Sequence, residues 1–218
     1  MRNLFNIDSP VMQKLSLVGT LLLMNIIWLI CCIPVVTIGA STTAMYRIMF
    51  DLREEKGGRV VDFFRAFREN FKNSTLLWLI YLLGAAVIYV LFCLLSWVNA
   101  GNLVQVLLLI PFFLFFFVWL FSLHYCFALS AYFENTLKNT LRNAVLMSMR
   151  HLPQTIICAA ITLLPVVFAF ISLYWLLMLG YVWLFMYPGL SFYWKSGQIS
   201  KVFANYTTVN SETDSEEE

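Results

Sequence analysis

The placement of charged residues constrains this chain of 218 residues more than any other feature. Its 14 Lys and Arg residues and 12 Asp and Glu residues all fall in four segments: 1–14, 47–72, 134–150 and 195–218. The stretches between them contain none of these residue types: 15–46, 74–133 and 151–194. A charged side chain at the centre of a membrane-spanning helix costs about 2.5–3.5 kcal/mol on insertion scales. The pattern therefore predicts apolar runs that lie in lipid and connectors that lie in water.

Composition supports the same conclusion. Hydrophobic residues make up 61% of the chain and charged residues 12%, about half the charged share of a soluble domain. Since a backbone in lipid must satisfy its own hydrogen bonds, long apolar runs form helices. We expect an all-α fold, a polytopic transmembrane helical bundle, over residues 1–204. Residues 205–218 are mostly Thr, Ser and acidic residues with no apolar pattern, and we expect a disordered acidic cytoplasmic tail there.

The apolar runs and their breaks predict six membrane spans. Pro34 ends the first helix, because its ring and missing N–H disfavour continuation, and Thr37 is placed to cap the next one. That second helix is short for a full crossing, so the bundle has five spans if it does not cross. The expected spans are 15–33, 37–53, 76–98, 103–133, 154–173 and 177–194.

The connector before the third span predicts an amphipathic helix. Its aromatic side contains Phe63, Phe64, Phe67 and Phe71, and its cationic side contains Arg65, Arg68 and Lys72. Such a helix is typical of one that lies in the headgroup region of a membrane. The alternative is a solvated helix packed against protein. A weaker pattern over residues 137–145 indicates a second interfacial helix, and the aromatic pair before Lys195 predicts an interface anchor.

Small residues are concentrated at the start of the second helix. Gly39 and Thr43 are spaced i, i+4, and so are Ala40 and Ala44. This spacing lets another helix approach closely. We expect these four residues to form a helix-packing face or a face for a partner protein.

The distribution of cations predicts the orientation of the chain. Seven Lys and Arg residues lie in segment 47–72 and three in segment 134–150, whereas the turn at 99–102 has none. By the positive-inside rule, the two basic connectors lie in the cytoplasm. The C-terminus then also lies in the cytoplasm.

Two blocks of sequence resemble a known family. The first is Pro-Val-Val-Thr-Ile-Gly-Ala-Ser-Thr-Thr-Ala-Met-Tyr at 34–46, and the second is Asp-Phe-Phe-Arg-Ala-Phe-Arg-Glu-Asn-Phe-Lys at 62–72. They are similar to blocks of the YesL-like family of bacterial integral membrane proteins, a domain of unknown function with the number 624. The resemblance extends over about residues 3–205. It implies a multi-pass protein of a Gram-positive cytoplasmic membrane, often encoded beside carbohydrate-uptake transporters, with no catalytic residues to transfer.

The sequence contains no motif that indicates catalysis. It has no phosphate-binding loop, no HExxH motif and no hydrolase elbow. His124 and His151 have no metal-ligand spacing, and the five cysteines lie in apolar runs as packing residues. We expect no enzyme activity, no cofactor and no metal site, and the net charge of +2 is too small to indicate a nucleic-acid partner.

Two polar residues lie within apolar runs. Asn25 is midway along the first helix, and its amide needs a partner because unpaired burial is costly. His124 lies deep in the run 103–133. Each either forms a hydrogen bond that holds two helices together or is an intramembrane polar contact for a solute.

Two functions remain open at this stage. One is a non-enzymatic accessory or scaffold protein, associated with carbohydrate uptake or utilisation. It would bind the lipid bilayer and a sugar permease or another membrane protein, through the Gly39–Ala44 face. The alternative is a transporter or channel subunit for a neutral solute such as a sugar, with Asn25 and His124 as contacts.

Overall fold

The computed structural model describes the backbone of residues 10–97, 102–171 and 173–216, and the side chains of 11–97, 107–168, 180 and 184–206. These residues form seven α-helices and one short 3-10 helix, η1. The all-α prediction is confirmed. The elements are α1 (Pro10–Cys31), η1 (Val35–Thr37), α2 (Ile38–Arg53), α3 (Val60–Trp97), α4 (Asn102–Tyr132), α5 (Leu137–Arg150), α6 (Leu152–Ile171) and α7 (Leu173–Glu216).

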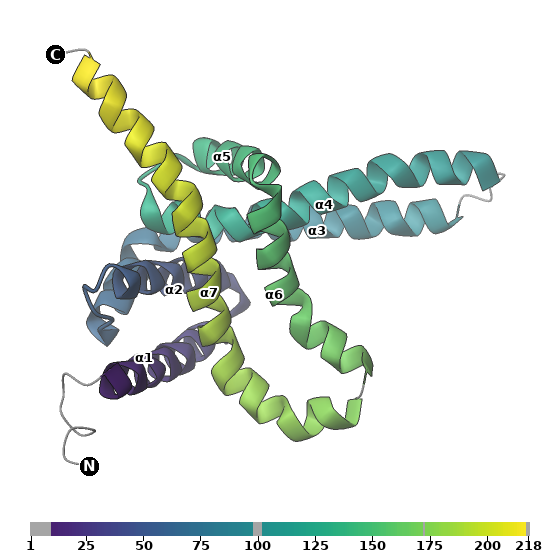
Figure 1. Cartoon of the computed structure of the whole chain (residues 1–218). Coiled ribbons are helices and arrows are strands. Elements are labelled where there is room, and N and C mark those ends of the chain that lie inside the picture. Colours follow the sequence, from purple (N-terminus) through teal and green to yellow (C-terminus); the bar gives the residue numbers. More distant parts are fainter. Residues whose placement is uncertain (1–9, 98–101, 172, 217–218) are drawn as a thin grey trace.

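The helices are arranged as two long hairpins joined at a central body (Figure 1). Helices α3 and α4 run side by side and project from the body, and α6 and α7 form a second hairpin that points in another direction. Helix α2 lies in the middle, where it contacts α3, α4 and α7. Helix α1 packs on α7, and α5 packs against the end of α4. The hairpins therefore meet near α2, where α4 also contacts α6 and α7.

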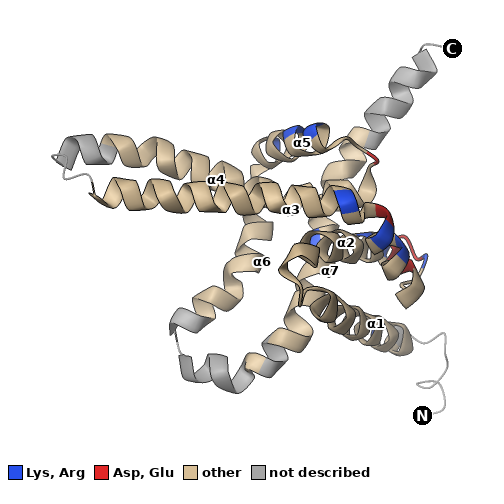
Figure 2. Ribbon diagram, turned by 180° about the vertical axis from the view of Figure 1, so that it is seen from behind, with Lys and Arg blue, Asp and Glu red and all other residues tan. Residues whose placement is uncertain are grey.

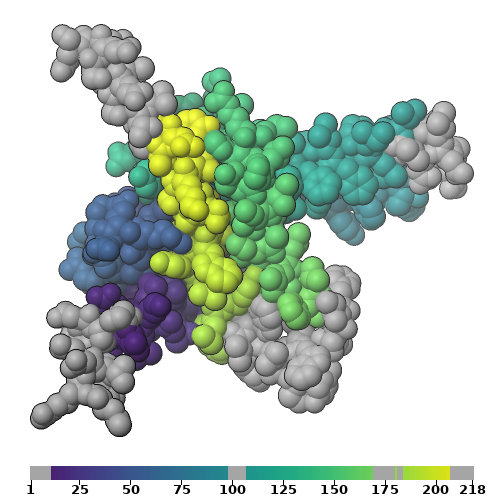
Figure 3. All heavy atoms as spheres, in the orientation of Figure 1, coloured from purple at the N-terminus to yellow at the C-terminus, as the bar shows by residue number. Residues whose placement is uncertain are grey.

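Charged and apolar residues occupy different parts of this arrangement. Figure 2 shows the charged residues around the α2–α3 turn, the neighbouring part of α3 and α5, whereas the projecting parts of the hairpins carry none. The α3–α4 hairpin stands clear of the body (Figure 3). Its outward side chains are apolar, with Leu83 67% exposed, Leu114 63% and Trp97 87%. Lipid tails are the solvent that such a surface requires.

Three helices of the described part are long and apolar enough to cross a membrane: Val11–Cys31, Val60–Trp97 and Leu107–Tyr132. A fourth crossing is added if Leu137–Arg150 and Leu152–Phe168, which meet at an angle of 100°, form one broken span. The structure therefore supports a multi-pass protein with three to four candidate spans. The side chains of 177–179 and 181–183, in the sixth expected span, lie outside the described part, and α2, with 16 residues, is shorter than the three candidate spans.

Helix α2 is the most buried element, and small residues make this burial possible. Gly39, Ala40, Thr43 and Ala44 are all buried against other helices of the same chain. A Cβ atom on Gly39 would lie 2.7 Å from the Cβ of Trp78 and closer still to the carbonyl oxygen of Ser74 on α3. The packing face is thus occupied within the chain and is not open to a partner.

A chain of hydroxyl groups joins three helices beside this contact. The Thr43 hydroxyl on α2 lies 2.8 Å from the Ser74 hydroxyl on α3, which lies 3.3 Å from the Ser130 hydroxyl on α4. Thr43 and Ser74 are fully buried. Hydrogen bonds between buried side chains fix the register of the helices that carry them.

Two expectations about helix boundaries are wrong. The amphipathic segment 60–72 and the span 76–98 are one continuous helix, α3, because the Asn-Ser-Thr sequence at 73–75 contains no residue that breaks a helix. Thr37 adopts helical dihedrals and its side chain does not cap α2. Its hydroxyl instead donates to carbonyl oxygens of the preceding turn, on Cys31 at 2.6 Å and on Pro34 at 2.7 Å.

The other predicted helices lie near their expected positions. Helix α6 ends at Ile171 and α7 begins at Leu173, close to the expected turn between 173 and 177. Helix α7 continues to Glu216, so its bounds include most of the segment 205–218 for which we expect disorder. The side chains beyond residue 206 lie outside the described part, and the boundary at 204/205 stays a prediction.

The close contact at Gly39 gives a first prediction. Gly39→Ala should lower the free energy of unfolding by about 1–3 kcal/mol, because the added methyl group forces α2 away from α3. Gly19→Ala is the matched control, since a Cβ on Gly19 of α1 would meet nothing within 4 Å and alanine favours a helix by up to about 1 kcal/mol. Thermal unfolding in detergent, followed by tryptophan fluorescence, measures both. Equal stability of the two variants would show that the contact is not tight.

Candidate functional site

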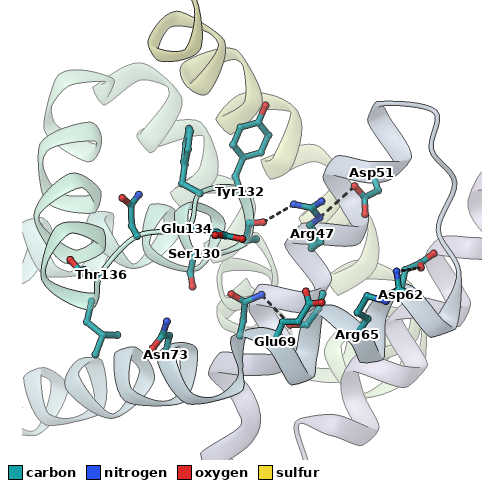
Figure 4. Close-up of a pocket in the computed structure, with 16 residues that line it drawn as sticks. Arg47, Asp51, Asp62, Arg65, Glu69, Asn73, Ser130, Tyr132, Glu134 and Thr136 are labelled. Atoms are coloured by element: carbon teal, nitrogen blue, oxygen red, sulfur yellow. Dashed lines mark hydrogen bonds and ion pairs between the residues drawn. The ribbon is translucent and has the colours of Figure 1, made fainter. Parts of the chain in front are cut away.

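The candidate site is a polar cleft of about 940 Å³ at the end of the bundle where the charges gather. Its walls are the second half of α2, the first part of α3 and the connection between α4 and α5 (Figure 4). Four carboxylates and two guanidinium groups line it: Asp51, Asp62, Glu69, Glu134, Arg47 and Arg65. Since acids outnumber bases, the cleft carries net negative charge.

The two arginines of the cleft are held by groups of this chain. Arg47 lies 3.6 Å from the Asp51 carboxylate one turn along α2, and its Nη1 donates to the Ala131 carbonyl oxygen of α4 at 3.4 Å. Arg65 lies 3.9 Å from the Asp62 carboxylate. Asp62 also accepts a 2.8 Å hydrogen bond from Nε of Arg59. Each cation therefore has a carboxylate close by.

Two of the carboxylates differ from the others. Glu69 on α3 and Glu134 in the α4–α5 connection are exposed, and neither forms an ion pair or hydrogen bond with the described side chains. They come from facing walls of the cleft (Figure 4). The free negative charge of the cleft is therefore concentrated at Glu69 and Glu134.

The local sequence explains why these walls face each other. The turn between α2 and α3 places Glu55 and Gly57 at positive φ, 57° and 80°, so the chain reverses within a few residues. On the other wall, aromatic rings fix the end of α4. The rings of Tyr132 and Phe133 contact Phe203 of α7 at centroid distances of 5.1 and 5.2 Å. Glu134 thus follows a segment that is anchored to the body.

Of the residues predicted for a membrane-interface helix on α3, Arg65 alone lines the described cleft. Phe63 is fully buried and Phe67 half-buried, whereas Phe64 is 49% and Phe71 39% exposed. The cations of the segment are exposed, namely Arg65, Arg68 and Lys72. The helix therefore packs one part of its aromatic side into the body and exposes another. Whether the exposed part lies on a membrane stays a prediction.

Asn25, the first predicted polar contact, is fully buried between α1 and α7. Its Nδ2 donates to the carbonyl oxygens of Leu184 at 3.1 Å and Phe185 at 2.8 Å. Helix α7 continues through Pro188, which has no N–H for the carbonyl four residues before it, that of Leu184. The amide of Asn25 thus supplies a donor that the proline removes.

Gly189 allows Asn25 to reach that position. A Cβ on Gly189 would lie 2.9 Å from the Leu21 carbonyl oxygen and 3.3 Å from the Asn25 Cβ. Helix α1 can therefore approach α7 closely at the proline. The Oδ1 atom of Asn25 is buried without a hydrogen-bond partner in the described part.

His124, the second predicted contact, lies in a different interface. It is buried between α4 and α6, with Nδ1 3.1 Å from the Leu120 carbonyl oxygen and Nε2 3.0 Å from the Thr162 hydroxyl. Both ring nitrogens are therefore engaged. The structure does not bring Asn25 and His124 together in one site, and neither lines the cleft.

Two basic residues at the contact between α2 and α7, Arg53 and Lys195, have roles that the sequence did not predict. Lys195 is not an interface anchor, because it is only 8% exposed and its Nζ lies 4.6 Å from the ring centroid of Phe192. Arg53 of α2 donates from Nε to the Ser196 hydroxyl at 2.9 Å and from Nη2 to the Tyr193 carbonyl oxygen. Gly197 leaves room for this guanidinium, whose Cζ would lie 2.5 Å from an added Cβ. Arg53 thus fastens α2 to α7.

The comparison with family models identifies one part of the chain. Residues 21–92 match the model of the family described as "Protein of unknown function, DUF624". The resemblance inferred from the blocks at 34–46 and 62–72 is confirmed over these residues. The DUF624 segment contains the α2 and α3 walls of the cleft, whereas the α4–α5 wall lies outside it. No curated protein and no solved structure matches the chain.

The link between Asn25 and Pro188 gives a second prediction. Asn25→Ala should lower the free energy of unfolding by about 1–3 kcal/mol, because two buried carbonyls lose a donor. In a Pro188→Ala background the backbone N–H returns, so the same change should cost clearly less. A double-mutant cycle of denaturation in detergent measures this coupling. Additive effects of the two substitutions would contradict the assignment.

Proposed function

We propose that this chain is a multi-pass protein of a bacterial cytoplasmic membrane that acts as a non-enzymatic accessory or scaffold protein in carbohydrate uptake or utilisation. The observation that supports this function best is the cleft. It lies in the charged part of the molecule, open to water, and away from the apolar exteriors of the hairpins. A membrane protein with its open polar cleft in this position is suited to contact a second molecule at the membrane surface.

The proposed orientation places the cleft in the cytoplasm. Segment 47–72, with seven Lys and Arg residues, supplies two of its walls. The positive-inside rule puts such a segment on the cytoplasmic side. In this arrangement the chain crosses six times, through α1, α2, α3, α4, α6 and α7, and its C-terminus is cytoplasmic.

The partner surface that we propose differs from the one expected from sequence. All four residues of the small-residue face of α2 are buried, and Gly39 and Thr43 contact α3 of the same chain. The cleft therefore replaces Gly39–Ala44 as the proposed partner surface. The association with carbohydrates rests on the family resemblance, and the cleft supports an accessory role without specifying a sugar.

A second candidate is a transporter or channel subunit for a neutral solute. The observation that favours it is the buried Oδ1 of Asn25, which has no partner among the described side chains and lies at the proline of α7. Helices interrupted near the midplane are common at transport sites. In this alternative a solute hydroxyl would donate to Oδ1.

The orientation gives a third prediction. Alkaline phosphatase, which is active only outside the cytoplasm, should be active when fused after residue 101. A green fluorescent reporter, which matures only inside, should fluoresce when fused after residue 136 and at the C-terminus. These fusions report the turn between α3 and α4, the cleft and the tail separately. Activity of the phosphatase fused after residue 136 would place the cleft outside and contradict the proposal.

A deletion strain provides a fourth prediction and separates the two candidate functions. If the chain assists a permease, deletion should reduce uptake of at least one radiolabelled oligosaccharide at least about twofold, and a plasmid copy should restore it. The purified chain alone in proteoliposomes should transport none of the same sugars. Unchanged uptake of every sugar would contradict the accessory role, and transport by the purified chain would establish the alternative.

A further inference from the structure

We propose that the cleft binds a basic segment, a stretch of chain with several Lys and Arg residues, from the cytoplasmic side of another membrane protein. This inference rests on the proposed function, because it names the chemistry of the partner that an accessory protein would contact. It is carried by the juxtaposition of Glu69 and Glu134 on facing walls of a large polar cleft.

The charges of the cleft favour a cationic occupant over an anionic one. Its four carboxylates exceed its two guanidinium groups, and both guanidiniums lie beside carboxylates of the chain itself. Glu69 and Glu134 have no such cation among the described side chains. Two like charges that face one cavity repel each other, and a bound cation removes this repulsion.

The neutral groups of the cleft suit a peptide. The side chains of Asn73 and Asn135 lie on opposite walls and can each donate and accept hydrogen bonds. Such amides can pair with the N–H and carbonyl groups of a peptide backbone. A ligand that consisted of a cationic group alone would not use these amides. A volume of about 940 Å³ holds several residues of an extended segment.

The structure holds the backbone segments that carry Glu69 and Glu134 in place before any ligand binds. Glu134 follows the aromatic cluster of Tyr132, Phe133 and Phe203, and Glu69 lies on the continuous helix α3. The Ser74–Ser130 hydrogen bond connects these two walls at 3.3 Å. A site that is already ordered loses less conformational entropy on binding.

The proposed location of the cleft indicates where the cationic segment comes from. Loops of membrane proteins on the cytoplasmic side are enriched in Lys and Arg. A cleft on that side of the membrane, at the level of the connectors, is close to such loops of a neighbouring protein. The acidic tail of this chain, by contrast, has the same sign of charge as the cleft and would be repelled.

The test uses the full chain in nanodiscs of phosphatidylcholine, a lipid without net charge. The probe is a fluorescein-labelled twelve-residue peptide with four Lys and Arg residues among Gly and Ser, and the reference peptide has Glu in their place. Fluorescence anisotropy should show binding of the basic peptide only. Because the contacts are exposed, affinity should fall as salt rises from 50 to 300 mM.

Charge variants assign the binding to the cleft. The double variant Glu69→Gln with Glu134→Gln should weaken binding about 5- to 10-fold. Arg65→Gln should tighten binding about twofold or more, since it leaves the cleft more negative. The matched control is Glu55→Gln, an exposed carboxylate in the α2–α3 turn that does not line the cleft. Opposite effects of the Glu and Arg variants cannot come from a general loss of structure.

Several outcomes would overturn the inference. They are equal binding of both peptides, loss of affinity in Glu55→Gln as large as in the double variant, or no binding at all. Binding of an oligosaccharide with release of the basic peptide would replace the peptide by a sugar as occupant. Since the assay needs neither the partner protein nor a growth phenotype, its failure leaves the deletion and orientation results unaffected, and the two proposals can be judged separately.

Discussion

The packing of α2 against its neighbours is the contact on which the rest of the structure depends. Gly39 lets the backbone of α2 approach Ser74 and Trp78 of α3 at a distance that no larger residue allows. Hydroxyl groups then tie α2 and α3 to α4, and Arg53 ties α2 to α7. The two hairpins meet in the body beside this helix, where α4 also contacts α6 directly. The walls of the cleft are therefore positioned by packing in the body, and not by the turns that connect them.

The class of fold can be predicted from the sequence, because the fold class depends on whether lipid or water surrounds each segment. Segregated charges and long apolar runs leave few alternatives to helices in lipid, and most of the helices begin near the expected residues. The continuity of α3 could not be predicted in the same way. At residues 73–75 the sequence changes from an amphipathic pattern to an apolar one. This change shows that the helix passes from a partly polar environment to an apolar one, and the helix itself continues. The spacing of apolar residues shows whether one face of a helix meets water, lipid or protein, but it does not show where the helix ends.

The candidate site was harder to predict because its residues come from distant parts of the chain. The sequence indicates that both connectors are charged, but it does not show that Glu69 and Glu134 face one cavity. Asn25 illustrates the same limit. Its need for a partner is evident from its position in an apolar run, yet its actual partners, next to Pro188, are some 160 residues away. Tertiary contacts of this kind leave no local signal in a single sequence.

The position of polar groups along the bundle separates structural from binding roles. In the apolar part, the amide nitrogen of Asn25 and the ring nitrogens of His124 are engaged by helix carbonyls or a threonine, because an unpaired polar group in lipid is costly. In the cleft, water can satisfy Glu69 and Glu134, so these groups can stay unpaired at little cost and are free to exchange water for a ligand. Polar groups that the fold already uses are therefore poor candidates for a ligand site. Those at the charged end, where the fold does not need them, are the ones able to bind a second molecule.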